Sequence, residues 1–379
     1  MSLETKKETE KEKEIEKKQE KEIVKETKKE NEKEKEKEKE EKKETDEKLK
    51  KPTSKDYYFD SYSHYSIHEE MLQDQIRTGS YCRAILKNKA LFKDKIVMDV
   101  GCGTGILSMF AAKAGAKRVI GIECSGIIEQ ARQIVKENGY SDIIKLVHKK
   151  CEDIVELPDG IEKVDIIISE WMGYCLFYES MLNTVIYARD RWLKKGGKIM
   201  PNKSSLFISG CIDQDFITDK ISFWNNVWGF KMNCIKKLIY LEPLVDIIDQ
   251  SSIVTNSSIL KSIDLNTITV EDLSFNVPFE LTSKYTDNIN AFVTYFTYTF
   301  DDCDEIVFVS TSPNSPETHW KQSIFYLQKP FRVQKLETIT GNFLMKPNEN
   351  NERDFDITID YKVDGKYAKI ESSQDYRLR

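Results

Sequence analysis

The sequence has few of the features that define membrane, secreted or metal-stabilised proteins. No apolar run reaches the ~18 residues that a membrane-spanning helix requires, and the Glu-rich N-terminus has no apolar stretch of the kind found in signal peptides. None of the eight cysteines is spaced as CxxC, and none clusters with the four histidines. We therefore expect no membrane span, no metal site and no disulfide framework, and a reducing location in the nucleus and cytoplasm.

Charge is distributed unevenly along the 379 residues. Residues 1–51 contain 19 Lys and 19 acidic residues, so their net charge is zero, whereas the rest of the chain carries the whole net charge of −6. Strict Lys/Glu alternation in residues 32–40 places like charges four residues apart, which disfavours a helix. We expect residues 1–51 to form a disordered arm. The acidic remainder disfavours direct nucleic-acid binding and suits a cationic partner.

Two patterns divide the rest of the chain. Between residues 95 and 200, apolar runs alternate with helical stretches, which is typical of a doubly wound, mostly parallel sheet. After Pro201, period-two runs predict antiparallel strands in a sandwich or barrel. We expect domains at 52–200 and 201–379. In the first, the expected strands are 95–100, 118–122, 144–148, 164–169 and 198–200, and the expected helices are 67–86, 106–114, 127–138 and 179–193.

An apolar insertion interrupts the second pattern. Residues 213–238 contain Phe223, Trp224, Trp228 and Phe230 within a region that otherwise reads as β structure. Exposed apolar surface of this kind usually packs on the protein's own core or on a partner subunit. Both alternatives are open at this point.

A glycine-rich segment, Asp99-Val100-Gly101-Cys102-Gly103-Thr104-Gly105, lies directly between an expected strand and an expected helix. Glycines let a backbone turn sharply and approach a ligand closely. A dinucleotide-binding loop, GxGxxG, would need glycine at position 106, which is Ile106, and no GxxxxGK[ST] motif is present. The GxGxG form is typical of methyltransferases that use S-adenosylmethionine.

Two glutamates follow the next two expected strands. Glu123 lies about 20 residues beyond the glycine loop, where an acidic residue accepts hydrogen bonds from ribose hydroxyls. Glu152 follows the third strand, where it could meet an adenine amino group. Either residue alone would be interpreted as a surface carboxylate, but together their positions favour a nucleoside site.

A second pair of glutamates encloses an aromatic loop. Glu170 comes directly after an apolar strand, where open α/β sheets place their active sites, and Glu179 ends the same loop. Gly173 suggests a tight bend that brings the two together. Two neighbouring carboxylates repel each other unless a cation intervenes. The pair is therefore either two unrelated loop residues or a site for a cation or for acid–base chemistry.

Four segments together resemble one family: Tyr58-Phe59-Asp60-Ser61-Tyr62, Asp99–Gly105, Ser169–Glu179 and Thr318-His319-Trp320. Over residues 56–379 the chain is similar to the protein arginine N-methyltransferases, in particular to the type I enzymes, which form asymmetric dimethylarginine. The stretch between Glu152 and Val164 departs from the family by about three extra residues, and residues 1–51 have no counterpart.

The resemblance implies a fold and a reaction. The fold is a Rossmann-like methyltransferase domain with N-terminal lid helices, followed by a β-barrel with a dimerisation arm at about 213–238. The reaction transfers methyl groups from S-adenosyl-L-methionine to arginine in glycine/arginine-rich proteins and histone tails. Glu170 and Glu179 would clamp the substrate guanidinium, which suits bidentate carboxylates. The two carboxylates balance the guanidinium and the sulfonium, and holding the nitrogen in line supplies roughly 7 kcal/mol or more of the barrier.

The resemblance also assigns the remaining residues. Asp74 and His319 would be catalytic as a proton relay, although His319 is equally well explained as a structural loop residue. Met71 in place of a bulkier Phe favours asymmetric dimethylation. The arm implies a homodimer, with higher oligomers left open. The cofactor-binding set is His68, Arg77, Gly101, Gly103, Gly105, Glu123, Glu152, Tyr62 and Phe59, and the substrate pocket is Tyr58, Met71 and Met181.

Two other functions compete with this one. A methyltransferase of a small cation would share the glycine loop but would need neither the barrel nor the arm. A non-catalytic dimeric scaffold would use the barrel, the arm and the charged segment for binding alone. The presence of both Glu170 and Glu179 disfavours the scaffold.

Overall fold

The computed structural model describes residues 61–379. The N-terminal segment 1–51, for which a disordered arm was predicted, lies outside these residues, as do Tyr58 and Phe59. Within them, no helix combines the length and the apolar character that crossing a membrane would require.

Three helices precede the first sheet. Helices α3 (Tyr65–Gln73) and α4 (Gln75–Lys87) meet at Asp74, and α5 spans Lys89–Phe92. The single helix predicted over 67–86 is therefore two helices. Asp74 has an extended backbone, and its carboxylate accepts the N–H of Arg77 at 2.8 Å, which caps the start of α4.

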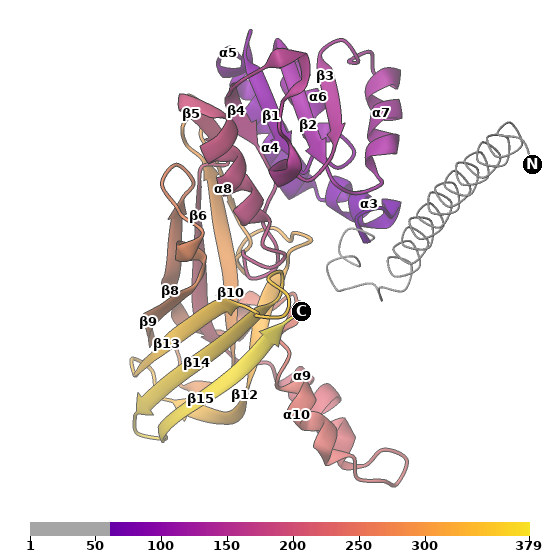
Figure 1. The fold of residues 1–379 in the computed structure, drawn as a ribbon. Helices are drawn as coiled ribbons and strands as arrows, with labels where there is room; N and C mark the ends of the chain where they lie inside the picture. The colour runs from indigo at the N-terminus through magenta and orange to yellow at the C-terminus, as the bar shows by residue number, and fades with distance from the viewer. Residues whose placement is uncertain (1–60) are drawn as a thin grey trace, which may run out of the picture. The chain divides into compact units, whose positions relative to one another are not determined.

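A five-stranded parallel sheet follows, with the strand order β3-β2-β1-β4-β5. The order reverses between β1 and β4, and open α/β sheets bind ligands at that switch point, outside the carboxyl ends of the strands. Helices flank the sheet (Figure 1). The elements are β1 (Ile96–Val100), α6 (Ile106–Lys113), β2 (Arg118–Glu123), α7 (Ile128–Glu137), β3 (Ile144–His148), β4 (Val164–Ile168), α8 (Met181–Trp192) and β5 (Leu193–Met200).

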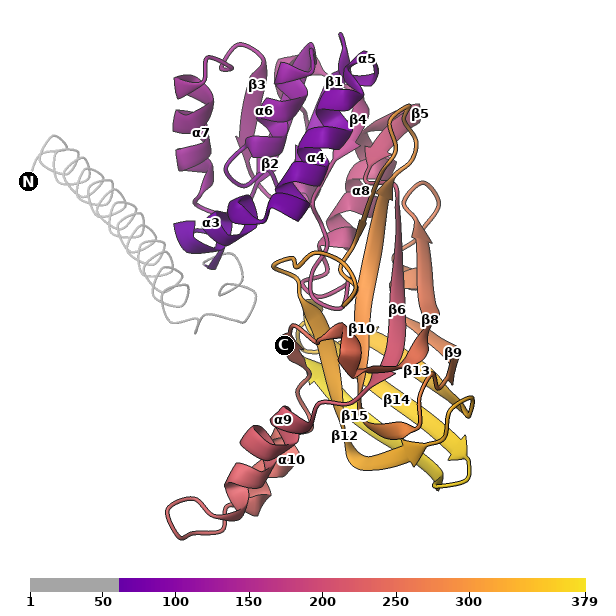
Figure 2. The ribbon, with the colours of Figure 1, turned by 180° about the vertical axis from the view of Figure 1, so that it is seen from behind.

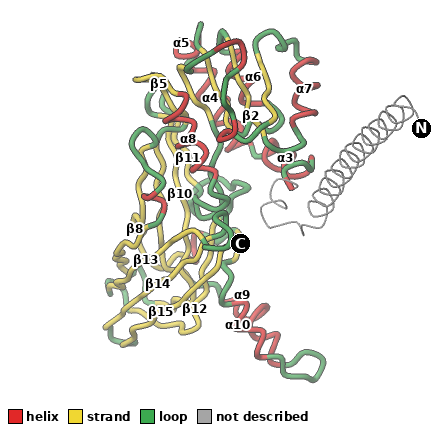
Figure 3. Tube along the Cα trace, in the orientation of Figure 1, coloured by secondary structure: helices red, strands yellow, loops and turns green. Residues whose placement is uncertain are grey.

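The second half consists mainly of strands, as Figure 3 shows, and the pairings between these strands are antiparallel. One sheet has the order β7-β12-β10-β6-β8 with β11 beside β10, and the other has the order β15-β14-β13-β9. The strands are β6 (Lys203–Cys211), β7 (Leu244–Asp246), β8 (Ile253–Asp264), β9 (Phe275–Thr282), β10 (Asp287–Phe300), β11 (Val307–Ser310), β12 (Gln322–Val333), β13 (Thr338–Pro347), β14 (Phe355–Asp364) and β15 (Lys369–Leu378).

Buried aromatic side chains join the two antiparallel sheets. The ring of Phe325 on β12 lies 6.0 Å from that of Phe343 on β13, and the ring of Phe292 on β10 lies 5.6 Å from that of Tyr361 on β14. All four side chains are at most 2 % exposed. The sequence predicted a sandwich or barrel here, and this aromatic layer closes the β half around one core.

The apolar insertion projects from this half (Figures 1 and 2). Trp228 is 95 % exposed and Phe230 is 69 % exposed, so neither packs on the chain's own core. At the base of the insertion, Asp213 accepts the Tyr326 hydroxyl and the N–H of Phe216. Its helical segments are α9 (Gln214–Phe216), η3 (Ile217–Ile221), η4 (Ser222–Asn225), η5 (Asn233–Ile235) and α10 (Lys236–Ile239).

The two halves are joined closely. Only residues 201 and 202 separate β5 from β6. Across the junction, the Ser80 and Tyr298 hydroxyls lie 3.0 Å apart, and the indole N–H of Trp320 donates to the carbonyl of Met172 at 3.0 Å. These contacts bring residues of the β half to the carboxyl edge of the parallel sheet.

Candidate active site

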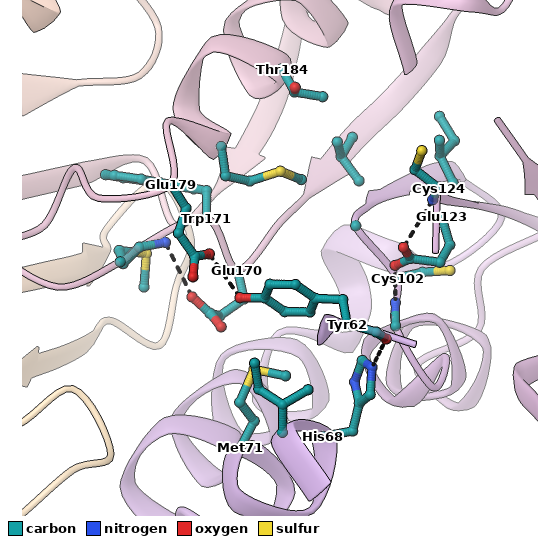
Figure 4. A pocket seen from close by; sticks show the side chains of 18 of the residues that line it. Tyr62, His68, Met71, Cys102, Glu123, Cys124, Glu170, Trp171, Glu179 and Thr184 are labelled. Carbon is teal, nitrogen blue, oxygen red and sulfur yellow. Dashed lines mark hydrogen bonds between the residues drawn. The ribbon is translucent and has the colours of Figure 1, made fainter. Parts of the chain in front are cut away.

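A cavity of about 610 Å³ lies at the switch point of the parallel sheet. Its wall includes the glycine loop after β1, the end of β2, helix α3 and the loop from Glu170 to Glu179. The β half contributes His319 and Trp320 from one loop and Glu352 and Arg353 from another. Figure 4 shows several of these side chains converging on the same space. The volume is typical of a pocket for a cofactor-sized ligand.

The glycine loop leaves room that other residues would fill. Gly101 has φ +73°, and a Cβ atom added there would lie 2.7 Å from the terminal methyl of Met181. A Cβ atom on Gly103, with φ +52°, would lie 3.2 Å from the ring of His68. The positive φ values favour glycine at both positions, and an added Cβ atom would crowd the flexible end of Met181 or the ring of His68. Gly105, with φ +85°, directly precedes α6.

Glu123 is held beside this loop by three backbone donors. Its Oε2 accepts the N–H of Gly103 at 2.9 Å, and its Oε1 accepts those of Cys124 at 2.9 Å and Ser125 at 2.8 Å. The predicted ribose acceptor thus has a fixed position at the end of β2. Glu152 also lines the cavity, with its Oε1 accepting the Thr184 hydroxyl at 2.7 Å.

Glu170 is paired with a buried arginine. The Nε and Nη2 atoms of Arg77 donate to Oε2 of Glu170 at 2.8 and 2.6 Å, and the N–H of Met172 donates to Oε1 at 3.2 Å. Burial lowers the pKa of Arg77, but the adjacent Glu170 carboxylate more than offsets this, so the net shift is upward. One of the two predicted clamp carboxylates therefore already has a cationic partner within the protein.

Glu179 reaches the same cavity from the other end of the loop. Its Oε2 accepts the Tyr62 hydroxyl at 2.8 Å (Figure 4). The bend depends on Gly173, where a Cβ atom would lie 2.1 Å from the carbonyl oxygen of Tyr178. Glu179 and Ser180 both have positive φ values, +76° and +54°, which are unfavourable for residues with side chains.

His68 and the two predicted pocket methionines also border the cavity. The Nε2 of His68 lies 2.8 Å from the carbonyl oxygen of Tyr62, and the His68 side chain is buried against the glycine loop. The backbone carbonyl of Met71 accepts an N–H from Nη1 of Arg77 at 3.2 Å. Met71 also lines the cavity. Met181 is the first residue of α8 and lies next to Gly101.

Asp74 and His319 are in direct contact, 245 residues apart in the chain. Oδ2 of Asp74 lies 2.7 Å from Nδ1 of His319 and accepts the backbone N–H of His319 at 2.9 Å. Burial by itself raises the pKa of Asp74, but the hydrogen bonds from the His319 side chain and from the N–H groups of Arg77 and His319 outweigh it. The net pKa of Asp74 is lowered. The same contact ties α4 to the β half.

The sequence analysis assigned no role to two residues that the structure places at or next to the site. Asp99 is fully buried behind the glycine loop, where burial raises its pKa to about 7. The Ser108 hydroxyl donates to its Oδ2 at 2.7 Å, and its Oδ1 has no hydrogen-bond partner. The other residue is Arg353, which lines the cavity but belongs to no motif recognised in the sequence.

Within residues 61–379, no group of three or more His, Cys, Asp or Glu side chains is placed to hold a metal ion.

Comparison with known proteins identifies the family. A model described as "Arginine methyltransferase oligomerization subdomain" matches residues 202–366, and one described as "Methyltransferase domain" matches residues 97–197. Protein arginine N-methyltransferase 1 of Caenorhabditis elegans is 52 % identical over 87 % of this chain and 94 % of its own length. The protein of the same name from Chlamydomonas reinhardtii is 53 % identical over 86 % of this chain and 94 % of its own length.

Solved structures give the same result. A "Trypanosoma brucei PRMT1 enzyme-prozyme heterotetrameric complex with AdoHcy" matches with a TM-score of 0.81 and 47 % identity, over 84 % of this chain and all of that chain. Arabidopsis thaliana Protein Arginine Methyltransferase 10 matches with a TM-score of 0.76 and 28 % identity, over 85 % of this chain and all of that chain.

The chain belongs to the protein arginine N-methyltransferase family. Its activity is methyl transfer from S-adenosylmethionine to protein arginine, and it contains the family's oligomerisation subdomain. The fold class, the enzyme class and the cofactor predicted from the sequence are confirmed. The glycines at positions 101 and 103, beside the fixed Glu123 carboxylate, fit a nucleoside-containing cofactor.

Proposed function

We propose that the enzyme forms mono- and asymmetric dimethylarginine on glycine/arginine-rich proteins and histone tails, with Glu170 and Glu179 clamping the substrate guanidinium. One observation carries this proposal: the two carboxylates line one cavity from opposite ends of a loop that Gly173 allows to bend. A planar, permanently charged guanidinium is the cation that two converging carboxylates suit best.

The two carboxylates have different environments, and this supports different roles. Glu170 shares its Oε2 with Arg77, and its Oε1 has remaining acceptor capacity toward the cavity. Glu179 is held by the Tyr62 hydroxyl and reaches the cavity from a strained backbone. Together they orient the guanidinium and concentrate its electron density on the nitrogen to be methylated, which is catalysis by positioning.

The methyl donor fits the other half of the cavity. S-adenosylmethionine, when bound, supplies an electrophilic methyl group. Gly101 and Gly103 would let its chain pass close to the backbone, Glu123 would accept its ribose hydroxyls, and Arg77 would pair with its carboxylate. His68, Glu152 and Tyr62, which line the cavity, would complete the set together with Gly105, which directly precedes α6.

The product is proposed from the pocket wall. Met71 and Met181 are flexible, unbranched side chains that can accommodate a methylated nitrogen. A bulkier Phe at position 71 would fill that space. We therefore expect a second methyl group on the same nitrogen. A relay from Asp74 to His319 is supported by their 2.7 Å contact.

The assembly is proposed from the arm. Trp228 and Phe230 are too exposed for a role in the core, and the family model for this half is an oligomerisation subdomain. The arm would dock on the partner's cofactor domain to form a homodimer. The location in nucleus and cytoplasm stays a prediction.

Mass spectrometry tests the reaction. The protein is incubated with S-adenosylmethionine and a glycine/arginine-rich peptide, and fragmentation then distinguishes the dimethylarginine isomers. We expect monomethyl product first and asymmetric dimethylarginine later. Symmetric or exclusively monomethyl product would contradict the pocket argument. No peptide methylation, with turnover of a small guanidino compound, would favour the small-cation enzyme instead.

A further inference from the structure

We infer that Arg353, in the loop between β13 and β14 of the β half, is a positioning residue for Glu179. This rests on the proposed function of Glu179 as one arm of the guanidinium clamp. The residue lies 174 positions from Glu179 in the sequence, yet its side chain donates through Nη1 to the carbonyl oxygen of Glu179.

The contact is made from both sides of the Glu179 backbone. The carbonyl of Arg353 accepts the N–H of Glu179 at 2.9 Å, while the guanidinium of Arg353 donates to the carbonyl of Glu179. The next residue is held in the same way, because the Ser180 hydroxyl donates to the carbonyl of Glu352. One loop of the β half therefore holds two consecutive residues of the catalytic loop.

These contacts act where the backbone needs support. Glu179 and Ser180 have φ values of +76° and +54°, and left-handed conformations in residues with side chains persist only when their surroundings fix them. The same conformation turns the Glu179 carboxylate into the cavity, toward Tyr62. Loss of the Arg353 side chain would leave the Glu179 carbonyl without this donor, and the carboxylate could turn away from its productive position.

The supporting loop is itself ordered by side chains. Oδ1 of Asn348 accepts the N–H groups of Asn350 at 2.9 Å and Asn351 at 3.2 Å, and Oδ1 of Asn351 accepts the N–H of Arg353 at 3.3 Å. Nδ2 of Asn348 donates to both carboxylate oxygens of Asp356 at 3.1 Å. The loop is anchored to β14 before it reaches the active site, which is how supporting residues fix reactive ones.

Steady-state kinetics of the full-length protein with an arginine peptide test this role. We expect Arg353→Ala to lower kcat/KM for the peptide by roughly 10- to 100-fold, the range for losing one charge-assisted hydrogen bond. The Kd for S-adenosylhomocysteine should change less than about threefold, because Glu123 and the glycine loop are untouched. Arg353→Lys keeps one donor and should restore part of the activity. Arg332→Ala, an exposed arginine on β12, is the matched control and should behave as wild type.

A double-mutant cycle separates positioning from general destabilisation. If Arg353 acts through Glu179, Arg353→Ala costs little further activity in a Glu179→Gln background, measured by single-turnover radiolabelling. Additive losses, or a parallel fall in melting temperature and cofactor affinity, would overturn the inference. Wild-type kinetics in Arg353→Ala would also overturn it and leave the proposed function intact. A wild-type protein that methylates no arginine would overturn both.

Discussion

Arg77 and Glu170 form a buried ion pair in which two guanidinium nitrogens donate to the same carboxylate oxygen, at 2.8 and 2.6 Å. The pair joins the first turn of α4 to the end of β4, so the N-terminal helices and the sheet meet at the carboxylate proposed to clamp the substrate. Because Arg77 occupies Oε2, substrate arginine would approach Oε1. The ion pair therefore fixes which side of Glu170 is available for chemistry.

Replacing Glu170 by Gln should reduce turnover about 100-fold or more, since one arm of the clamp loses its charge. The same change leaves Arg77 buried beside a neutral side chain, so the melting temperature should also fall. Glu179→Gln should lose comparable activity with a smaller fall in melting temperature, because a glutamine side-chain carbonyl can still accept the Tyr62 hydroxyl. Methylation kinetics and thermal melting distinguish the two variants. Unchanged methylation in Glu170→Gln would contradict the clamp.

Asp74 should stabilise the protein most at neutral pH. Its folded-state pKa is lowered, so its contribution is present above its unfolded pKa of about 3.9 and is lost as pH falls through the folded value. We expect Asp74→Asn to cost about 2 kcal/mol near pH 6, with the difference from wild type shrinking toward pH 3. Thermal melting across this range measures it. Asp364→Asn, at an exposed carboxylate, is the control, and a pH-independent difference for Asp74→Asn would contradict the assignment.

The contribution of Asp99 to stability should depend on pH in the opposite direction. Its folded-state pKa is raised to about 7, so between about pH 4 and pH 7 the folded protein keeps a proton that the unfolded chain has released. Wild-type stability should fall as pH rises through this window. The melting temperature of Asp99→Asn relative to wild type should increase from pH 4.5 to 7.5 and level off above pH 8. A constant offset over that range would show that Asp99 is ionised in the folded state.

Trp228 should matter for association and not for folding of the subunit. Because it is 95 % exposed, its removal takes nothing from the core, but aromatic anchors often dominate interfaces. We expect Trp228→Ala to weaken self-association at least about tenfold in sedimentation velocity, with a parallel loss of activity at low protein concentration. Leu336→Ala, which removes a 73 % exposed side chain outside the arm, is the control. Unchanged association in Trp228→Ala would exclude the arm as the dimer contact.

The sequence predicted those parts of the site that depend on local geometry. The glycine loop and Glu123 lie within one strand–helix–strand unit, and the positions of such residues follow from the alternation of strands and helices. The parallel strands were predicted within a residue or two, except that β5 begins at Leu193 and not at 198. Lys194, Lys195 and Gly196 in its first half are exposed, so this half lacks the apolar pattern of a buried strand.

Contacts across long sequence separations could not be predicted from pattern. In the sequence, Arg353 is one of several charged residues in a polar turn. Only the pairing of β13 with β14 places it against Glu179. The break between α3 and α4 was also missed, because Asp74 fits the helical pattern and its capping role depends on the bond to Arg77. Likewise, the period-two runs after Pro201 identified strands but could not distinguish a sandwich from a barrel. That choice depends on how the two sheets pack.

The two-residue connection between β5 and β6 has a consequence for how the enzyme can evolve. The cofactor-binding fold is shared by methyltransferases of many kinds, and it could in principle be exchanged as a module. Here an inserted or deleted residue at the junction would displace Trp320 from Met172 and His319 from Asp74 together. The β half therefore keeps a fixed position relative to the half that contains the parallel sheet. Diversification should occur in the surface loops of the β half and in the insertion at 213–238, where length can change without moving these two contacts.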